Sequence, residues 1–444
     1  MKKKQTRRAF VKNTVLTTAA LPLGVGLFSS RGYSNIIGAN DRMNFAVIGL
    51  HGRGREHIRS IAVCENAVVS HICDVDQREL DSTAAEVNEL TGSAPVMEKD
   101  IRKLLESEDI DVITIATPEH WHAPMAIMGL QAGKHVYIEK PCSHNPAEGV
   151  MLVAAQKKYG KLVQMGNQQR SSVHTGELIQ KIHEGIIGRA YMGKAWYSNK
   201  RRSIGIGKEV PVPDYLDWEL WQGPAPRRPY KDNVHPYNWH WFWHWGTGET
   251  LNNGTHEVDL CMWALEVQFP KRVTASGGRY HFKDDWEFYD TLVTSFEYDD
   301  KMITWEGKSC QNMPYFERGR GVTIHGTEGS VLMDRNGYEI YDLDNKKVSA
   351  YFKPETDATL DIRGGGPMTD RHFQNLIDAI RKGEKLRSPI DEGNVGVTML
   401  QLSNIAWKFN RVLNLDNTSG MILNDPEAAS LWQREYEPGW APEI

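Results

Sequence analysis

Apolar positions in the first part of the chain form short runs that alternate with amphipathic stretches. The strand-like runs are 43–50, 66–76, 111–117, 134–141 and 161–167, and the helical stretches between them include 54–64, 124–133 and 146–159. Such alternation predicts a parallel sheet covered by helices on both faces.

The pattern changes beyond Asn167, where longer β-rich stretches follow one another. These stretches are 189–200, 271–282, 289–300, 301–309, 321–335 and 338–344, and two helical stretches, 370–384 and 393–410, come after them. Successive strand patterns without intervening helices predict a mostly antiparallel sheet. We expect the two late helices to pack back on the body of the protein.

Length and charge limit the possible classes of protein. The chain has 444 residues, more than one hydrophobic core usually serves, so two domains are expected. The formal net charge is −5, although the first 35 residues carry seven Lys or Arg and no acid. Without those seven charges the remainder carries −12, which argues against nucleic acid as a partner.

The N-terminus has the pattern of a targeting segment. A basic start that includes Arg7 and Arg8 in "TRRAFVK" precedes a weakly apolar run and small residues, similar to a twin-arginine export signal. A membrane anchor is the alternative, but the apolar run is short and contains Thr, Gly and Pro. We therefore expect residues 1–40 to be a signal peptide and linker, a periplasmic location, and no stable membrane insertion after signal removal.

A glycine-rich turn follows the first predicted strand. It consists of Gly49, Leu50, His51, Gly52, Arg53 and Gly54. The first and last glycines match the dinucleotide fingerprint G-x-G-x-x-G, whereas a histidine occupies its middle position. Asp74 ends the second strand at the distance suited to accepting both ribose hydroxyls, and its charge would repel a 2′-phosphate. The turn therefore predicts NAD as the cofactor.

These patterns together define the predicted fold class, which is α/β. We expect an N-terminal Rossmann dinucleotide-binding domain over 41–166 and a C-terminal α+β domain with a large, mostly antiparallel open sheet over 167–444.

Lys140 follows an apolar strand at the carboxyl edge of the predicted parallel sheet. Open α/β folds bind their ligands at this edge. A lysine near a cationic nicotinamide would have a lowered pKa, which would help it to handle protons near neutral pH. The alternative is a solvated lysine at the end of a strand.

Several short motifs share one family resemblance. "ATPEHWHAP" follows one strand, "EKP" follows the next, and "GTGETLNNGTHEVD" and "HFQNLIDAIRKGE" come later. In this combination they resemble the Gfo/Idh/MocA oxidoreductases over roughly 43–410. The resemblance implies that the lysine of "EKP", Lys140, lies between the nicotinamide and the substrate hydroxyl. It also implies a second domain whose open sheet serves as a substrate wall or forms a homo-oligomer.

The same resemblance implies further cofactor contacts. They come from the segments around "PEHWH" and "EKP" and from the end of the last Rossmann strand: Thr117, Glu119, His120, Trp121, His122, Glu139, Lys140 and Asn167.

The segment 239–245 places Trp at every second position, with His240, Phe242 and His244 between them. Period two predicts an extended chain with all four indoles on one side. Some of these indoles, with the aromatic residues just upstream, would line a cleft and suit a pyranose ring; the others would pack in the core. In a helix the two histidines would share a face, but no HExxH motif, completing carboxylate or zinc-type cysteine pair is present, so no metal is predicted.

The chain is predicted to be helical after "GTGE", which places Asn252, His256 and Asp259 on one face. By the resemblance His256 is the catalytic acid/base, while Asn252 stands where the family usually has Asp. An amide can orient a hydroxyl but cannot take its proton, so proton transfer would fall to His256 and Lys140. A structural histidine is the alternative for His256, and Asp259 is expected to orient it or to support a structural network.

Substrate contacts are expected from Arg170, Tyr197, Trp243, Asn252 and His256. The leading hypothesis is an NAD-dependent oxidoreductase that transfers a hydride from a ring hydroxyl carbon, possibly C3, of a sugar or glycoside. The second is an NAD-dependent glycoside hydrolase or lyase with a transient 3-keto intermediate and recycled NAD, because "GLHG", "PEHWH" and Asn167 resemble α-N-acetylgalactosaminidases of that type. The third is a sugar-binding or scaffold protein, and Asn252 is its only support.

Overall fold

Six parallel strands form the first sheet, in the order β3-β2-β1-β4-β5-β6. They are β1 Met43–Ile48, β2 Ala67–Cys73, β3 Val96–Glu98, β4 Val112–Ile115, β5 His135–Ile138 and β6 Val163–Met165. The central strands consist mostly of buried apolar residues, as expected for a parallel sheet covered on both faces. The computed structural model describes residues 42–353 and 366–444, and all that follows concerns Met43–Ile444, which form one unit.

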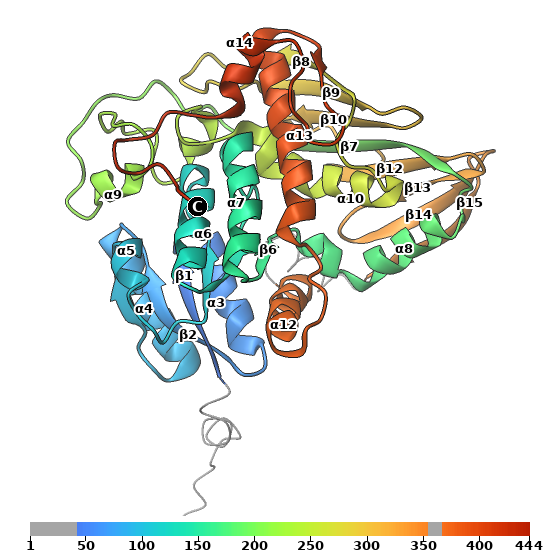
Figure 1. The fold of residues 1–444 in the computed structure, drawn as a ribbon. Helices are drawn as coiled ribbons and strands as arrows, with labels where there is room; N and C mark the ends of the chain where they lie inside the picture. Colours follow the sequence, from blue (N-terminus) through green and yellow to red (C-terminus); the bar gives the residue numbers. More distant parts are fainter. Residues whose placement is uncertain (1–41, 354–365) are drawn as a thin grey trace, which may run out of the picture. The chain divides into compact units, whose positions relative to one another are not determined.

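Helices connect the strands of this sheet and cover it (Figure 1). They are α3 Arg53–Val63, α4 Gln77–Thr91, α5 Ile101–Leu104, α6 His122–Gln131 and α7 Pro146–Tyr159. The chain reverses its strand order between β1 and β4, so the carboxyl ends of these two strands open a crevice where a ligand can bind.

The second sheet has ten strands in the order β15-β14-β13-β12-β7-β10-β9-β8-β16, with β11 paired to β7. They are β7 Ala190–Lys200, β8 Arg272–Gly278, β9 Thr291–Glu297, β10 Met302–Lys308, β11 Cys310–Gln311, β12 Arg320–Gly326, β13 Gly329–Met333, β14 Gly337–Asp342, β15 Lys347–Phe352 and β16 Leu413–Asn414. The β7–β10 pair is parallel and the other pairs are antiparallel. The predicted fold class is therefore confirmed.

Helices α8 Val173–His183, α10 Thr255–Leu265 and α13 Ile390–Phe409 pack on the second sheet (Figure 1). Gly193 of β7 shows how closely α10 approaches, because a Cβ there would lie 2.9 Å from the Cys261 side chain. Helix α12 Pro367–Lys382 packs against α3, so the predicted late helices do return to the body. No helix within the described ranges is long and apolar enough to cross a membrane, and the predicted signal segment lies outside those ranges.

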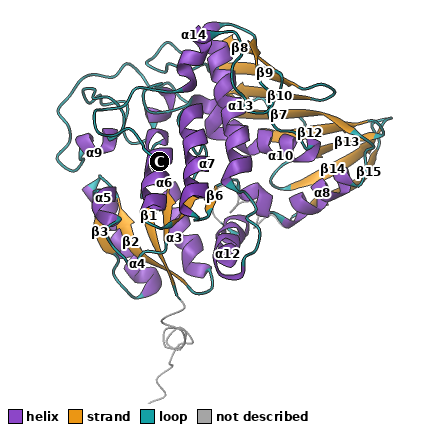
Figure 2. Cartoon of the chain, in the orientation of Figure 1, coloured by secondary structure: helices purple, strands orange, loops and turns teal. Residues whose placement is uncertain are grey.

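The segment 201–249 follows β7 of the second sheet and is mostly loop (Figure 2). It contains only α9 Trp218–Gln222 and the 3₁₀ helix η3 Asn238–Trp241. Main-chain bonds fix it to the end of β2, from Gln77 N to Tyr215 O (2.9 Å) and from Asp217 N to Val75 O (3.0 Å). The segment therefore covers the carboxyl edge of the first sheet.

The prediction of an extended strand at 239–245 is wrong. The segment is a 3₁₀ helix followed by turns. Its four indoles have four separate ring neighbours: Trp239 stacks on His240, Trp241 on Trp286 and Trp243 on Phe288, while Trp245 meets Trp218 edge to face. Packing of Trp241, Trp243 and Trp245 against rings far away in the sequence overrides the alternating pattern.

Candidate active site

The turn after β1 brings α3 unusually close to the sheet. Gly49 has φ +83°, and a Cβ there would lie 2.6 Å from the Ala116 carbonyl; a Cβ on Gly54 would lie 1.8 Å from the Gly49 oxygen. A Cβ on Gly52 would meet nothing within 4 Å. The two outer glycines therefore pack the turn tightly, and the middle of the turn leaves space for a phosphate group at the start of α3.

A cavity of about 320 Å³ opens beside this turn. Thirteen of the predicted site residues line it: Gly49, Leu50, His51, Gly52, Arg53, Asp74, Thr117, Glu119, Trp121, His122, Glu139, Lys140 and Asn252. The covering segment 201–249 adds Leu220, Trp221, His235, Pro236, Tyr237, Trp239 and His240. The cavity therefore runs from the glycine turn to the first residues of the second domain.

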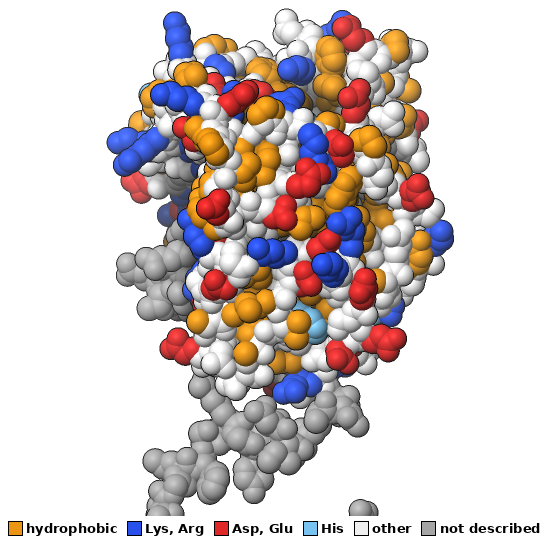
Figure 3. Space-filling model, turned by 90° about the vertical axis from the view of Figure 1, so that its left-hand side faces the viewer, with side chains coloured by type: hydrophobic (Ala, Val, Ile, Leu, Met, Phe, Trp, Pro, Cys, Tyr) orange, Lys and Arg blue, Asp and Glu red, His pale blue; other side chains and the backbone are white. Residues whose placement is uncertain are grey.

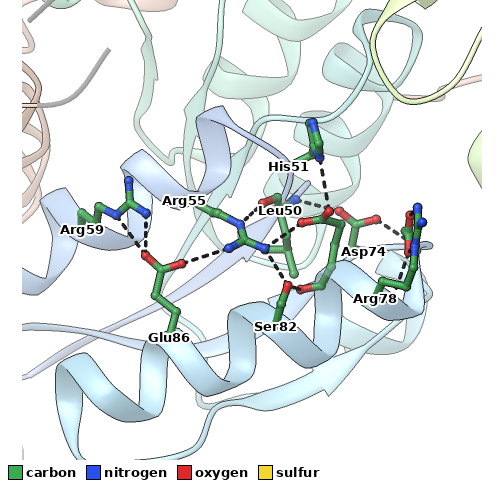
Figure 4. A network of polar contacts seen from close by, with 10 residues as sticks. Leu50, His51, Arg55, Arg59, Asp74, Arg78, Ser82 and Glu86 are labelled. Atoms are coloured by element: carbon green, nitrogen blue, oxygen red, sulfur yellow. Dashed lines mark hydrogen bonds and ion pairs between the residues drawn. The ribbon is translucent and has the colours of Figure 1, made fainter. Parts of the chain in front are cut away.

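Asp74 lines the cavity and lies beside Leu50 of the glycine turn (Figure 4). Its carboxylate accepts hydrogen bonds from the main-chain nitrogens of Leu50 (2.7 Å) and Asp76 (2.9 Å). Burial raises its pKa to about 6, although these two bonds act in the opposite direction. A fixed carboxylate at the end of β2 suits the ribose hydroxyls of NAD, so these residues fit the predicted cofactor.

Glu139 of the "EKP" segment points into a polar cluster. One of its oxygens accepts from Arg53 Nε (2.7 Å) and Gln168 Nε2 (3.0 Å) and lies 3.0 Å from His57 Nε2. Burial acts to raise the pKa of this carboxyl, but Arg53 and His57 hold it well below its ordinary value. The cluster ties the end of β5 to α3 and so fixes the backbone that carries Lys140.

Lys140 is directed toward the second domain. Its Nζ donates to the main-chain oxygen of Asn252 (2.7 Å) and lies 3.4 Å from that residue's Oδ1. Burial lowers its pKa below the ordinary value. Glu119 lines the same cavity, and burial raises the pKa of its carboxyl to about 7 against the effects of a Thr247 hydrogen bond and the Lys140 charge. The cavity thus holds an acid and a base that both titrate away from their usual ranges.

Asn252 lies in a π-helical turn, Thr250–Gly254, that leads directly into α10. Its Nδ2 lies 3.5 Å from Glu249 Oε1, and Glu249 is buried in an ion pair with Arg201 (Nη2–Oε1 3.1 Å). An aspartate at 252 would put a second carboxylate beside this buried one. Its like charge gives a structural reason for the amide and removes the only support for a non-enzymatic protein.

His256 lies on α10 about one turn after Asn252, as predicted, but it does not line the cavity. It is 7% exposed, and burial, with nearby Arg335 and Lys140, lowers its pKa well below the ordinary value. Within the described part of the chain its Nδ1 has no hydrogen-bond partner. The ring is therefore neutral and has one nitrogen available to a polar group, and its catalytic role stays a prediction.

The remaining expected substrate contacts lie elsewhere. Arg170 pairs with Asp259 (2.9 Å) and Glu392 (2.6 Å), so Asp259 supports a structural network. Tyr197 accepts from Asn199 Nδ2 and lies against the Arg320 guanidinium. Trp243 lines a different cavity. None of the three expected residues lines the cavity at the glycine turn.

Three predicted cofactor residues also lie outside the lining. His120 bonds through Nε2 to the Trp221 main-chain oxygen (2.9 Å), so it anchors the covering segment. Asn167 is buried at the end of β6, and neither amide atom has a partner in residues 42–353 and 366–444. Gly54 acts through packing, as described above.

The sequence patterns did not predict most of the residues with which the segment 201–249 lines the cavity, nor the ion pair between Glu249 and Arg201. Tyr237 and Trp221 belong to the aromatic supply that the composition indicates, but no local pattern marks His235, Pro236 or His240 as lining residues. They come to the cavity through the long loop and its bonds to β2, which sequence periodicity does not predict.

The glycine turn, Asp74 and the half-buried Lys140 at the end of β5 define a dinucleotide-dependent enzyme fold. Comparison with known families agrees. Residues 43–167 match the oxidoreductase family's NAD-binding Rossmann fold, and residues 189–441 match the same family's C-terminal alpha/beta domain. The chain belongs to the Gfo/Idh/MocA oxidoreductase family.

Solved structures of low identity share this fold. One is the WlbA dehydrogenase from Bordetella pertussis in complex with NADH and UDP-GlcNAcA, with 21% identity and a TM-score of 0.62 over 84% of this chain and 99% of that one. Another is the aldose-aldose oxidoreductase from Caulobacter crescentus complexed with glycerol, with 17% identity and a TM-score of 0.63 over 84% of this chain and 100% of that one.

Curated relatives include glycosyl hydrolase family 109 proteins. Those of Shewanella putrefaciens and Shewanella pealeana are 27% and 28% identical over 166 and 170 residues. The match spans 36% of this chain and 36% of each relative, so the chain aligns with about a third of their length.

Proposed function

We propose that the protein is an NAD-dependent oxidoreductase that acts on a ring hydroxyl, possibly at C3, of a sugar or glycoside. The observation that carries the proposal is the position of Lys140. Its half-buried ammonium lies at the carboxyl end of β5, in the same cavity as the NAD-fitting turn and next to Asn252 of the second domain.

The side chains of the cavity suit the handling of a hydroxyl proton. Lys140 Nζ can donate to the substrate oxygen, and burial lowers its pKa below the ordinary value, which makes the ammonium a better proton donor. The Asn252 amide can orient the same hydroxyl. His256 lies outside the cavity lining, and its lowered pKa makes the ring a weak proton acceptor, so Lys140 carries the proton chemistry in this proposal. NAD, when bound between Asp74 and Lys140, supplies the hydride acceptor.

The test is a nicotinamide absorbance assay with a panel of sugars and glycosides. The wild-type protein is expected to reduce NAD with at least one of them, and Lys140→Met to bind NAD equally well without reducing it. A protein that binds no NAD would overturn the proposal.

A redox-neutral glycoside hydrolase is the second candidate, and its support is the similarity to the curated relatives named above. In that reaction the oxidation at C3 is reversed after loss of the aglycone, so no net NADH forms. Incubation with p-nitrophenyl glycosides without added NAD separates the two functions. Repeated release of nitrophenol favours hydrolysis, and a net change in nicotinamide absorbance favours the dehydrogenase.

We also propose that the protein reaches the periplasm by the twin-arginine route. The support is the "TRRAFVK" sequence with Arg7 and Arg8. Replacing both arginines with lysine should leave the precursor in the cytoplasm, as measured by fractionation. Export of the double variant at the wild-type level would contradict the route.

A homo-oligomer that associates through the second sheet is a further proposal. Three large apolar side chains on loops beside this sheet, Tyr280, Met313 and Phe316, are 72%, 64% and 62% exposed. Light scattering should give a mass above that of one chain, and Phe316→Glu should lower that mass.

The surface charge does not favour nucleic acid as a partner. On the face drawn in Figure 3, basic and acidic side chains are interspersed and form no continuous basic patch.

A further inference from the structure

The segment that follows β2 carries both of the side chains by which nicotinamide dinucleotides are distinguished. A carboxylate at this place suits the free 2′-hydroxyl of NAD, whereas an arginine nearby accommodates the 2′-phosphate of NADP. Asp74 is such a carboxylate, and Arg78, at the start of α4, is such an arginine; both line the cavity at the glycine turn. The choice of dinucleotide therefore depends on which of the two side chains is available to the ribose.

Arg78 is held by a third side chain of the cavity wall, Asp76 (Figure 4). Its Nε donates to Asp76 Oδ1 (3.1 Å) and its Nη2 to Asp76 Oδ2 (2.8 Å), which makes a bidentate ion pair. The guanidinium carbon also lies 3.3 Å from the centroid of the Tyr215 ring in the covering segment. The Arg78 side chain is 57% exposed, so its charge would reach a ligand in the cavity if Asp76 did not neutralise it.

Asp74 uses the main-chain donors that a phosphate at the same place would need. Its carboxylate accepts from Leu50 N and from Asp76 N, and the second of these bonds joins the two carboxylates to one turn of the chain. The two acids therefore act on a 2′-phosphate in different ways. Asp74 repels it and occupies the N–H groups, while Asp76 occupies the nearby guanidinium.

We propose that Asp76 is a specificity-determining residue of the cofactor site, because by holding Arg78 it withdraws the cation that would bind the 2′-phosphate of NADP. NAD is then preferred through two carboxylates together, and removal of Asp74 alone does not give a site for NADP. The proposal rests on the cofactor site of the proposed function but on no step of the sugar reaction.

A second pair of the same construction supplies a matched control. Asp100 caps α5 and bonds Arg102 two residues later (Oδ2–Nη2 2.6 Å), just as Asp76 caps α4 and bonds Arg78. Asp100 also lines the cavity, but Arg102 does not, and its guanidinium carbon lies 4.7 Å from the centroid of the Trp440 ring. The two pairs therefore differ in whether the arginine faces the cofactor.

The experiment is titration of the purified full chain with NAD and with NADP, followed by tryptophan fluorescence. Asp76→Asn removes the charge that holds Arg78 and keeps an oxygen that can cap α4. The double variant Asp74→Ser/Asp76→Asn should bind NADP about 30-fold more tightly than Asp74→Ser, because Arg78 then forms charge-assisted hydrogen bonds with the phosphate. Asp76→Ser, which also keeps a capping oxygen, should give the same gain in place of Asp76→Asn.

Controls separate this effect from a general change of charge and from misfolding. Asp74→Ser/Asp100→Asn has the same net charge as the test variant and should bind NADP no better than Asp74→Ser. Adding Arg78→Met to the test variant should remove the gain, and all variants should melt within a few degrees of the wild type.

Three results would overturn the proposal: a test variant that binds NADP no more tightly than the Asp100 control, a gain that survives Arg78→Met, or a wild type that binds NADP as tightly as NAD. A wild type that binds NAD but reduces it with no sugar would overturn the proposed function alone. A wild type that binds neither dinucleotide would overturn both.

Discussion

Glu119 offers the most quantitative test of the site's electrostatics. Its carboxyl is buried, and burial raises its pKa from 4.5 to about 7. A carboxyl whose pKa is raised on folding binds its proton more tightly in the folded state. Its contribution to stability is therefore complete below pH 4.5 and is lost as the pH rises to about 7. The loss corresponds to about 3 kcal/mol at pH 8.

Glu119→Gln removes this ionisation and keeps an oxygen that can accept from Thr247. The variant should equal the wild type near pH 4.5 and exceed it at pH 8 by about 3 kcal/mol, which is roughly 4 °C in melting temperature for a folded unit of ~400 residues. Thermal melts of ligand-free protein followed by circular dichroism between pH 4.5 and 8 measure this difference. Glu108→Gln, at an exposed position, is the matched control and should melt like the wild type at every pH.

The reasoning fails if the melting temperatures of Glu119→Gln and the wild type keep a constant separation across this pH range. It also fails if the variant is less stable at pH 8. Either outcome would mean that Glu119 is not held as a neutral acid in the cavity.

Three further predictions concern the same cavity. Asp74→Ala should weaken NAD binding about 100-fold by fluorescence titration, and the wild type should itself lose affinity below about pH 6, where burial keeps this carboxyl protonated. Asn252→Asp should cost about 1 kcal/mol at pH 8 and less at pH 5 in the same melts, because it adds a carboxylate beside Glu249 whose charge Lys140 Nζ, 3.4 Å from the Asn252 oxygen, offsets in part. Gly54→Ala should abolish NAD binding or folding, because its Cβ would lie 1.8 Å from a backbone oxygen. Gly176→Ala is the control: the nearest contact of its Cβ would be at 4.0 Å, so this variant should be neutral or slightly stabilising in a thermal melt.

The part of the site that sequence predicts is the part carried by parallel strands. Gly49, Asp74 and Lys140 each follow a strand whose apolar run is visible in the sequence, and parallel strands bring their carboxyl ends to one edge. Because this geometry is common to the whole fold, their convergence on one cavity follows from the pattern alone.

The part that sequence does not predict is built from long-range packing. The Trp/His run looks like a strand by period, yet three of its four indoles pack against rings far away in the sequence. The amide at Asn252 looks anomalous until Glu249 is found beside it in the π-helical turn. The separate cavity that Trp243 lines brings Asn145 and Gln401, more than 250 residues apart in sequence, into one wall.

The central claim, that Lys140 carries the proton chemistry of an NAD-dependent reaction, is tested most directly by single-turnover nicotinamide absorbance in wild-type protein and Lys140→Met. Both should bind NAD with similar affinity, and only the wild type should show transient or lasting reduction of NAD with a sugar or glycoside. Equal reduction in both proteins, or failure of the wild type to bind NAD, would contradict the account.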